Sequence, residues 1–469
     1  MTEQVRRAEF HQSVEVHTIY RIPTEHRHGR VRDLFTVWFS TNMTLLTIVT
    51  GALGPKIFDL SLIWAIVAVI AGNLVGAVFM ALHAAQGPVL GVPQMVQSRG
   101  QFGVWGAVPI IVLVVLMYIG FAASNCVVGG EALDDALPVL GRVPAVLLLA
   151  FISLVPCILG YGAIHACSKA VTWLSGIAVM YCLVVGFWHM PVTLLTELHG
   201  SVAGFCGMFS IAALWQIAYA PYVSDSSRYL PEDSLSVRNT FWASYGGTVL
   251  GTILPMVLGA FLVLQWPGES VVQSLGHLAG VWGAPVLVVL SLSLSIALAN
   301  AMSVYCGALS SITIIQTFLP AWRAGLKSRV VLTCALLGLS LFFALGMADS
   351  FMKSYAAFLD ILMAVMVPWT AINLYDYYVL RHGDYDVESF FRKDGGIYGY
   401  VNWAAVGSYV LGVLVEIPFL KNEFFTGFFV PYLHKVDVSW LVSLVVTSLF
   451  YAVVSRRSSV GDVSRPSSC

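Results

Sequence analysis

The sequence predicts an all-α membrane protein with twelve transmembrane helices, two of them interrupted by polar residues. Its 469 residues are 58% hydrophobic and only 10% charged, with a mean hydropathy of +0.82. A soluble chain carries roughly 25% charged residues, so this composition indicates a polytopic membrane protein within the lipid bilayer. The net charge of −1 argues against nucleic acid as a partner.

Apolar stretches near the ~20 residues that a spanning helix needs recur along the whole chain. They lie at about 34–57, 61–83, 104–130, 144–164, 168–190, 203–224, 239–264, 281–306, 329–347, 355–380, 398–416 and 436–455. An even number of spans puts both termini on one side. Of the 24 Lys and Arg residues, those that fall in loops on the other side are Lys56, Arg142, Lys353, Lys421 and Lys435. The positive-inside rule therefore predicts a multi-pass protein of the cytoplasmic membrane with both termini in the cytoplasm.

The first span is interrupted by the polar run WFSTNMT, from Trp38 to Thr44. Asn42, which stands among hydroxyl residues in this run, is costly within a membrane unless its amide finds partners. The run therefore predicts a discontinuous helix.

The sixth span is interrupted by Pro221 and the hydroxyl and charged residues that follow it. Proline removes a backbone donor and clashes with the preceding turn, so we expect a break at about residues 217–221. Polar backbone freed inside a membrane is tolerated where it faces protein or a wet cavity, and transporters build binding sites there. Trp215 and Tyr219 share a helix face beside this break. Such an aromatic pair suits a flat ring with polar edges.

With five spans in each repeat, the two interrupted spans hold equivalent positions, a pattern that points to a transporter site. The predicted parts are a cytoplasmic tail (1–33), a first five-helix repeat (34–190), a second five-helix repeat (203–380), two additional helices (398–455) and a cytoplasmic tail (456–469).

Motifs of other function classes are missing from the sequence. The 11 His residues contain no HxxxH pair and the 8 Cys residues no CxxC pair, so we expect no metal site and no cofactor. Neither a Walker A sequence nor a GxSxG element is present, which argues against ATP-driven transport and against an enzyme.

Several motifs occur together in one order along the chain. They are WFSTN (38–42), GALG (51–54), GPVLGVPQMVQSRGQFG (87–103), NCVVGGEAL (125–133), YAPYVSDSSRYLP (219–231), SVYCGALS (303–310), NLYDYYVLRHGDYDV (373–387) and GGIYGYVNW (395–403). With these motifs the chain resembles the nucleobase:cation symporter family of purine-cytosine permeases and the bacterial hydantoin transporter, over residues 20–455. The resemblance implies a leucine-transporter-type fold, with a 5+5 inverted repeat, discontinuous helices 1 and 6, and alternating access.

The resemblance also implies a substrate site between spans one, three, six and eight. The family's tryptophan in span six matches Trp215, with Gln216 beside it. In span three, Phe121 replaces a second tryptophan, and Asn125 stands where an amide often reads the edge of the ring. Ser303 replaces the family's Asn in span eight. The remaining predicted contacts are Asn300, which we expect to take over from that Asn, together with Asn42, Thr44 and Tyr219.

The residues that would bind a coupling cation favour a proton over sodium. In sodium-coupled members, backbone carbonyls that match Ser40 and Met43 join two adjacent hydroxyl side chains, but those hydroxyl positions fall here on Ala297 and Leu298. Ser293 and Ser295 lie nearby but would need a register shift.

A proton carrier needs a titratable group within the membrane, and acids in that position are functional by default. Asp360, in span ten, is the best-placed candidate, and Glu131, at the end of span three, is the second.

The sequence thus predicts a monomeric secondary symporter that imports a cytosine- or purine-type nucleobase with H⁺ or Na⁺. One alternative is sodium-coupled transport of another small N-heterocycle, such as hydantoin, allantoin, or a vitamin-type pyrimidine or pyridine. A second is a solute channel, which would give unsaturable flux that ignores the ion gradient. A third is a membrane-embedded enzyme, which no nucleophile-base or metal constellation supports.

Overall fold

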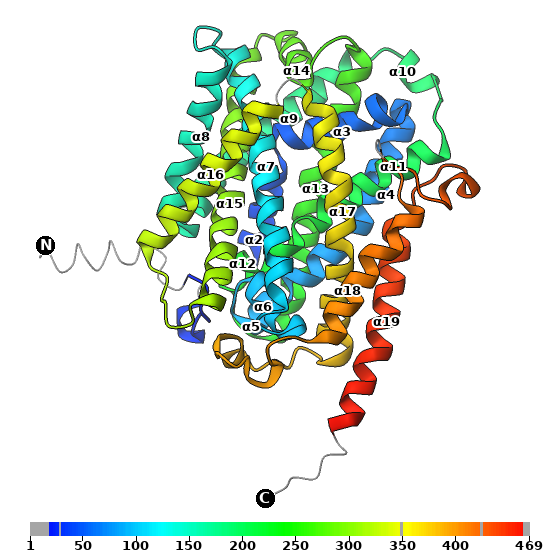
Figure 1. Ribbon diagram of the computed structural model, residues 1–469. Helices are drawn as coiled ribbons and strands as arrows, with labels where there is room; N and C mark the ends of the chain where they lie inside the picture. Colours follow the sequence, from blue (N-terminus) through cyan, green and yellow to red (C-terminus); the bar gives the residue numbers. More distant parts are fainter. Residues whose placement is uncertain (1–17, 28–29, 348–349, 423–424, 463–469) are drawn as a thin grey trace, which may run out of the picture.

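The computed structural model describes residues 18–27, 30–347, 350–422 and 425–462 as a bundle of helices (Figure 1). The first 17 residues of the predicted N-terminal tail and the last seven of the C-terminal tail lie outside the described residues.

The longer helices are α2 (Val31–Asn42), α3 (Leu45–Phe58), α4 (Leu62–Ala84), α7 (Ala107–Ala136), α8 (Arg142–Leu159), α9 (Tyr161–Trp188), α11 (Val202–Ile217), α13 (Ser234–Gln265), α15 (Pro285–Phe318), α16 (Leu326–Met347), α17 (Phe351–Tyr375), α18 (Trp403–Glu416) and α19 (Ser439–Asp462). The shorter ones are η1 (Thr24–His26), α5 (Gln86–Leu90), α6 (Gln94–Phe102), α10 (Thr193–Thr196), α12 (Ala220–Ser227), α14 (Val271–Gly280), η3 (Asp376–Leu380), η4 (Glu388–Phe391), η5 (Gly396–Tyr398), η6 (Ile417–Phe419) and η7 (Val430–Leu433).

Every predicted span coincides with one of these helices or with a consecutive pair, which confirms the predicted fold class. Within the described ranges, ten helices are long and apolar enough to cross a membrane. The pair α2 and α3, bent by 58° at its break, adds an eleventh span, and the shorter apolar helix at Trp403–Phe419 supplies the twelfth.

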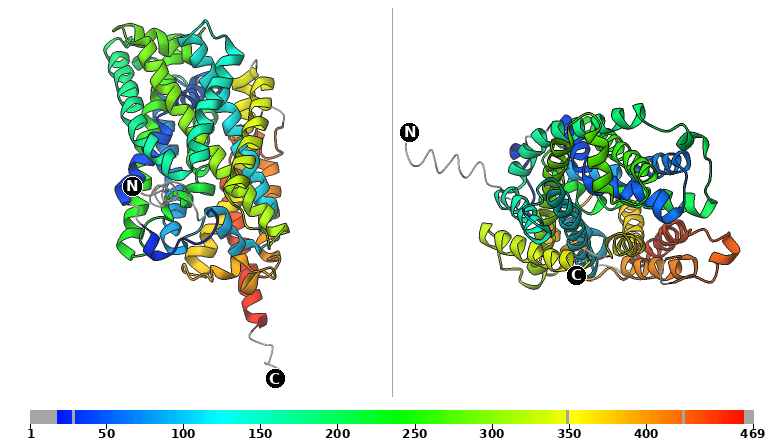
Figure 2. Two further views of the ribbon diagram at one scale, coloured as in Figure 1. Left: turned by 90° about the vertical axis from the view of Figure 1, so that its left-hand side faces the viewer. Right: turned by 90° about the horizontal axis from the view of Figure 1, so that it is seen from above.

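The two ends of the bundle are distinguished by the chain termini. We call the end where α2 begins and α19 ends the proximal end, and the opposite one, where α3 ends, the distal end (Figure 1). α18 and α19 lie at one side of the bundle in both Figure 1 and Figure 2. The other helices surround the meeting point of the two helix breaks.

The outside of the bundle is apolar. Large hydrophobic side chains such as Phe151, Trp173 and Phe342 are more than 60% exposed, whereas Arg99, Arg228 and other charged groups are buried in the interior. In water this arrangement would be costly, but it suits a surface that lipid covers.

The two breaks arise from local sequence. Residue Asn42 ends α2, and the Thr44 hydroxyl caps α3 by accepting a hydrogen bond from the Thr47 amide at 3.4 Å. α11 ends at Ile217, and α12 begins three residues later, at Ala220, with Pro221 in its first turn, where a missing N–H costs nothing.

Close packing holds α3 against α13. A Cβ atom on Gly51 would lie 1.9 Å from the Met256 carbonyl oxygen, and one on Gly259 would lie 1.8 Å from the Ile48 carbonyl oxygen. Only glycine fits at these two positions, and small residues of this kind let membrane helices approach closely. The helix that follows the first break is therefore fixed against the body of the bundle.

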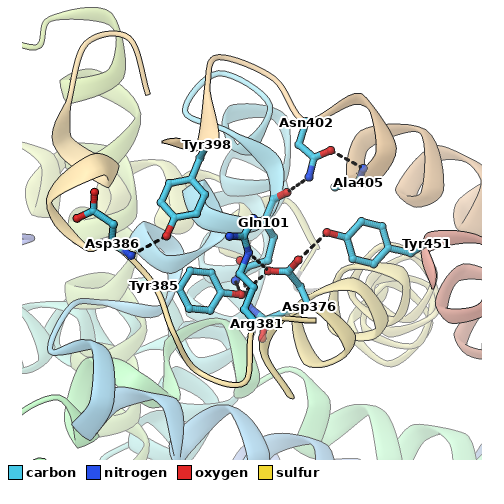
Figure 3. A network of polar contacts seen from close by, with 10 residues as sticks. Gln101, Asp376, Arg381, Tyr385, Asp386, Tyr398, Asn402, Ala405 and Tyr451 are labelled. Carbon is cyan, nitrogen blue, oxygen red and sulfur yellow. Dashed lines mark hydrogen bonds and ion pairs between the residues drawn. The ribbon is translucent and has the colours of Figure 1, made fainter. Parts of the chain in front are cut away.

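A polar network closes the proximal end around the buried carboxylate of Asp376 (Figure 3). This carboxylate accepts hydrogen bonds from the Tyr385 hydroxyl, from Arg381 Nε at 3.1 Å and from the Tyr451 hydroxyl at 2.8 Å. Burial and the neighbouring Asp376 carboxylate raise the pKa of Tyr385 well above its usual range, so this hydroxyl stays protonated and remains a donor. Gln101 Nε2 also donates to Tyr385 at 3.0 Å, which connects α6 to the network.

We expect Tyr451→Phe to lower the melting temperature of the detergent-purified protein. The variant removes a hydrogen bond to a buried charge, a loss of about 1.5–3 kcal/mol. Tyr432→Phe is the control, because that side chain is 72% exposed, and its melting temperature should not change. Equal melting temperatures for the two variants would contradict this account of the network.

Candidate functional site

A small cavity lies where the two broken spans meet α7 and α15. Its volume is about 30 Å³, and its lining consists of Thr41, Thr44, Leu46, Phe121, Asn125, Trp215, Ala218, Tyr219, Tyr222, Ala299 and Ser303. We call it the central cavity. Since a single buried water needs about 10–15 Å³, a heterocyclic ring enters only if the walls move apart.

Aromatic side chains form one wall of the central cavity. The rings of Phe121 and Trp215 meet edge to face, with centroids 6.1 Å apart and planes at 86°. Tyr219 and Tyr222 continue this wall, with centroids 5.6 Å apart. The predicted pair of Phe121 and Trp215 is thus brought together, but in direct contact, so the two rings must separate to sandwich a ligand.

A hydrogen bond across the two breaks holds Trp215 in place. Its indole Nε1 donates to Asn42 Oδ1 at 2.7 Å, while Asn42 Nδ2 donates to the Trp38 carbonyl at 2.7 Å and to Thr248 Oγ1 at 3.2 Å. Asn42 is fully buried and lies outside the cavity lining. It therefore positions the tryptophan and does not itself face the cavity.

Gln216 also lies outside the cavity lining. Its Nε2 donates to Asn73 Oδ1 at 2.7 Å and to Thr252 Oγ1 at 3.1 Å, and its Oε1 accepts from Thr248. Consecutive helix residues point about 100° apart, so Gln216 faces α4 and α13 when Trp215 faces the cavity. All the hydrogen-bonding atoms of this amide are engaged within the protein.

Of the remaining predicted polar contacts, some line the cavity and one points away from it. Asn125 lines the cavity, and no hydrogen bond joins its side-chain amide to another described residue. Ser303 also lines it and donates to the Ala299 carbonyl at 3.2 Å. Asn300 instead points toward α7 and α8, where it donates to Cys126 Sγ at 3.6 Å and to Ser153 Oγ at 3.2 Å.

The predicted cation residues lie at two separate places. Beside the first break, Ser295 Oγ donates to the Met43 carbonyl at 2.7 Å, and the Ser40 carbonyl accepts from the Met43 amide at 3.1 Å. A cavity of about 10 Å³ adjoins this point and is lined by hydroxyls of Ser40, Thr41, Ser168 and Ser295. Asp360 lies away from it, in a larger cavity at the distal end.

Sequence reasoning missed two kinds of residue. Tyr222 lies seven residues after Trp215 and three after Tyr219, so the helical face could have been extended past Pro221 to find it. Asn73, the partner of Gln216, is a single amide in an otherwise apolar span. Because burying an unpaired amide in a membrane is unfavourable, its presence there could have indicated a hydrogen-bond partner on another helix.

Two discontinuous spans that meet at a small polar cavity within an all-helical bundle define a membrane transporter with a leucine-transporter-type fold. The comparisons with known proteins agree. The solved structure of Mhp1, a nucleobase-cation-symport-1 family transporter in a closed conformation with bromovinylhydantoin bound, has a TM-score of 0.76 at 18% identity over 94% of both chains.

Comparison of the sequence with known proteins shows the family to which the chain belongs. A family described as a permease for cytosine/purines, uracil, thiamine and allantoin matches residues 21–443. YxlA of Bacillus subtilis, provisionally named a purine-cytosine permease, is 36% identical over 451 residues, which cover 94% of this chain and 96% of YxlA. The purine-cytosine permease fcyB of Emericella nidulans is 24% identical, with coverage of 86% and 81%. The chain belongs to this permease family and is a transporter rather than an enzyme.

We expect Asn42→Ala to weaken the binding of a heterocyclic base of the kinds that the family description names, because Trp215 loses the hydrogen bond that holds its ring in place. If binding must restore the position of the ring at a cost of about 1–3 kcal/mol, Kd rises by roughly five- to more than a hundredfold. The measurement is equilibrium binding of radiolabelled base to the purified protein. Asn239→Ala, on α13 and outside the cavity lining, is the control. An unchanged Kd in monodisperse Asn42→Ala protein would argue against the positioning role.

Proposed function

We propose that this protein is a secondary symporter that imports a nucleobase of the cytosine or purine type together with a cation. The observation that carries the proposal is that Trp215 and Phe121 line one cavity with Asn125, whose amide has no hydrogen-bond partner among the described residues. Trp215 and Phe121 would stack on the faces of the ring. Asn125, which presents a donor and an acceptor together, would pair with adjacent N–H and C=O groups at its edge.

The names of the relatives support this substrate class, since both YxlA and fcyB are named for purines and cytosine. Thr44, Tyr219 and Ser303 would complete the contacts. We do not expect Asn42, Gln216 and Asn300 to contact the substrate, because their amides bind other protein groups outside the cavity lining. They would hold the residues of the cavity wall in position.

A second candidate is import of another small N-heterocycle, such as hydantoin, allantoin, or a vitamin-type ring. The observation that favours it is Ser303, whose short hydroxyl is engaged with its own helix and offers less than an amide to a base edge. The family description, which includes thiamine and allantoin, is compatible with this candidate.

For the cation, we propose a proton that binds Asp360. This carboxylate on α17 lines a cavity at the distal end, which the distribution of Lys and Arg assigns to the outside of the cell. Sodium is the second candidate, because Ser295 reaches the Met43 carbonyl and thereby supplies the side-chain oxygen that Ala297 and Leu298 lack.

We expect Trp215→Ala to abolish uptake of radiolabelled cytosine and adenine, because the ring loses its main stacking surface. Protein in the membrane, measured by immunoblot, should stay at its normal amount. Trp242→Ala is the matched control, since that side chain is 61% exposed on α13. Normal uptake by Trp215→Ala would overturn the proposed site. The same assay with hydantoin, allantoin, thiamine and pyridoxine distinguishes the two substrate classes.

The coupling ion is tested in proteoliposomes with either a pH gradient without sodium or a sodium gradient at equal pH. We expect accumulation with the pH gradient, its loss in Asp360→Asn, and an unchanged Kd for the base in that variant. Accumulation that requires sodium, persists in Asp360→Asn and is lost in Ser295→Ala would replace the proton with sodium.

A further inference from the structure

A second, larger cavity opens at the distal end of the bundle. Its volume is about 260 Å³, against about 30 Å³ for the central cavity. It lies between the distal ends of α3, α11, α17 and α19, and the loop before α19 closes one side. We call it the distal cavity. In contrast to the central cavity, it needs little expansion to admit a small heterocycle.

The distal cavity continues toward the central cavity along one face of α11. Gly207, Ile211 and Leu214 line the distal cavity, and Ala218 lines the central one. The steps of four, three and four residues keep these positions on a single helical face. Leu214 and Ala218 are about one turn apart, a rise of ~5.4 Å. A molecule in the distal cavity is therefore one turn of helix away from the central cavity.

The polar groups of the distal cavity offer both an acceptor and a donor. The carboxylate of Asp360 makes no hydrogen bond or ion pair with the residues that the structure describes, so its acceptor oxygens are available. Lys421 lies at the mouth, with its Nζ donating to the Lys435 carbonyl at 3.3 Å. An ammonium has three donors, so Lys421 retains others for a ligand.

The charges of the distal cavity nearly cancel. Its carboxylates belong to Asp59, Asp360 and Asp437, and its ammonium groups to Lys421 and Lys435. A cavity for a multivalent anion or cation would carry an excess of the opposite sign, whereas a nearly balanced set suits a neutral polar molecule.

An aromatic side chain, Trp440, is held in a fixed orientation at this cavity. Its Nε1 donates to Ser210 Oγ at 2.9 Å, and one face stacks on Phe209 with a centroid distance of 6.2 Å. Its N–H is satisfied and the side chain is only 3% exposed, so Trp440 presents a small part of its ring to the cavity. A preorganised ring of this kind suits a flat partner.

We propose that the distal cavity is a second binding site for the transported heterocycle, which occupies it before it enters the central cavity. The identity of the ligand rests on the proposed function. The exposed part of Trp440 contacts the ring, and Lys421 donates to its carbonyl oxygen. Asp360, to which the proton is assigned, lines the same cavity, so base and proton arrive in one compartment.

The test is protection of a reporter cysteine in the distal cavity. In full-length Leu420→Cys protein, where the half-buried residue 420 lines the cavity and leaves Lys421 intact, reaction of residue 420 with maleimide is followed by mass spectrometry, with and without millimolar cytosine or adenine. Simple occupancy slows the reaction by 1 + [L]/Kd, so base at ten times its Kd gives about elevenfold slowing. Lys56→Cys is the control, because that exposed residue at the distal end lies outside the cavity lining.

The same slowing should persist in Trp215→Ala, where the central cavity is disabled, and should disappear in Trp440→Ala. Met363→Trp, which places a bulky ring in the cavity, should abolish the slowing as well. This variant replaces Trp440→Ala if that protein aggregates. The inference is overturned if residue 420 shows no protection, if protection is lost in Trp215→Ala, or if it survives in Met363→Trp. Uptake measures the proposed function separately: normal uptake by Trp215→Ala refutes that function, whatever the protection at residue 420.

Discussion

The hydrogen bond from the Trp215 indole to the Asn42 amide is the contact on which the central cavity depends. It joins the end of α11 to the end of α2, the two points where spanning helices stop and restart. At a break, backbone groups lose their helical partners, and the membrane offers no water to replace them. A direct bond between the two breaks therefore fixes their relative position, and with it the ring that faces the cavity.

Behind this contact, α4 and α13 supply a complete set of polar partners. Asn73 and Thr252 accept from Gln216, and Thr248 bridges Gln216 and Asn42. In a medium of low polarity, a fully satisfied network is rigid, whereas one missing partner is expensive. The network therefore holds Trp215 in place, and the movement that admits a ring falls to Phe121 with the rest of α7 and to α15.

The fold could be predicted from the sequence because the bilayer imposes long apolar helices, and because Pro221 and Asn42 are conspicuous within them. Which side of each helix faces the site was harder to predict. Gln216 stands next to Trp215 in the sequence but points to the other side of α11, and Asn300 turns toward α7 and α8. Likewise Ser295, not residue 297 or 298, reaches the first break. These orientations depend on how the helices rotate against their neighbours, which motif positions alone do not specify.

The length of α18 has a consequence for the membrane itself. Its 14 residues rise about 21 Å and η6 adds about 6 Å, whereas the hydrocarbon core of a bilayer is about 30 Å thick. Tilting would only shorten its reach, so the few ångströms that remain are met by flanking residues or by slight thinning of the lipid beside α18. Trp403, 76% exposed at the start of α18, is placed to hold the interface at that level. This side of the transporter therefore has the least margin in length against the thickness of the bilayer.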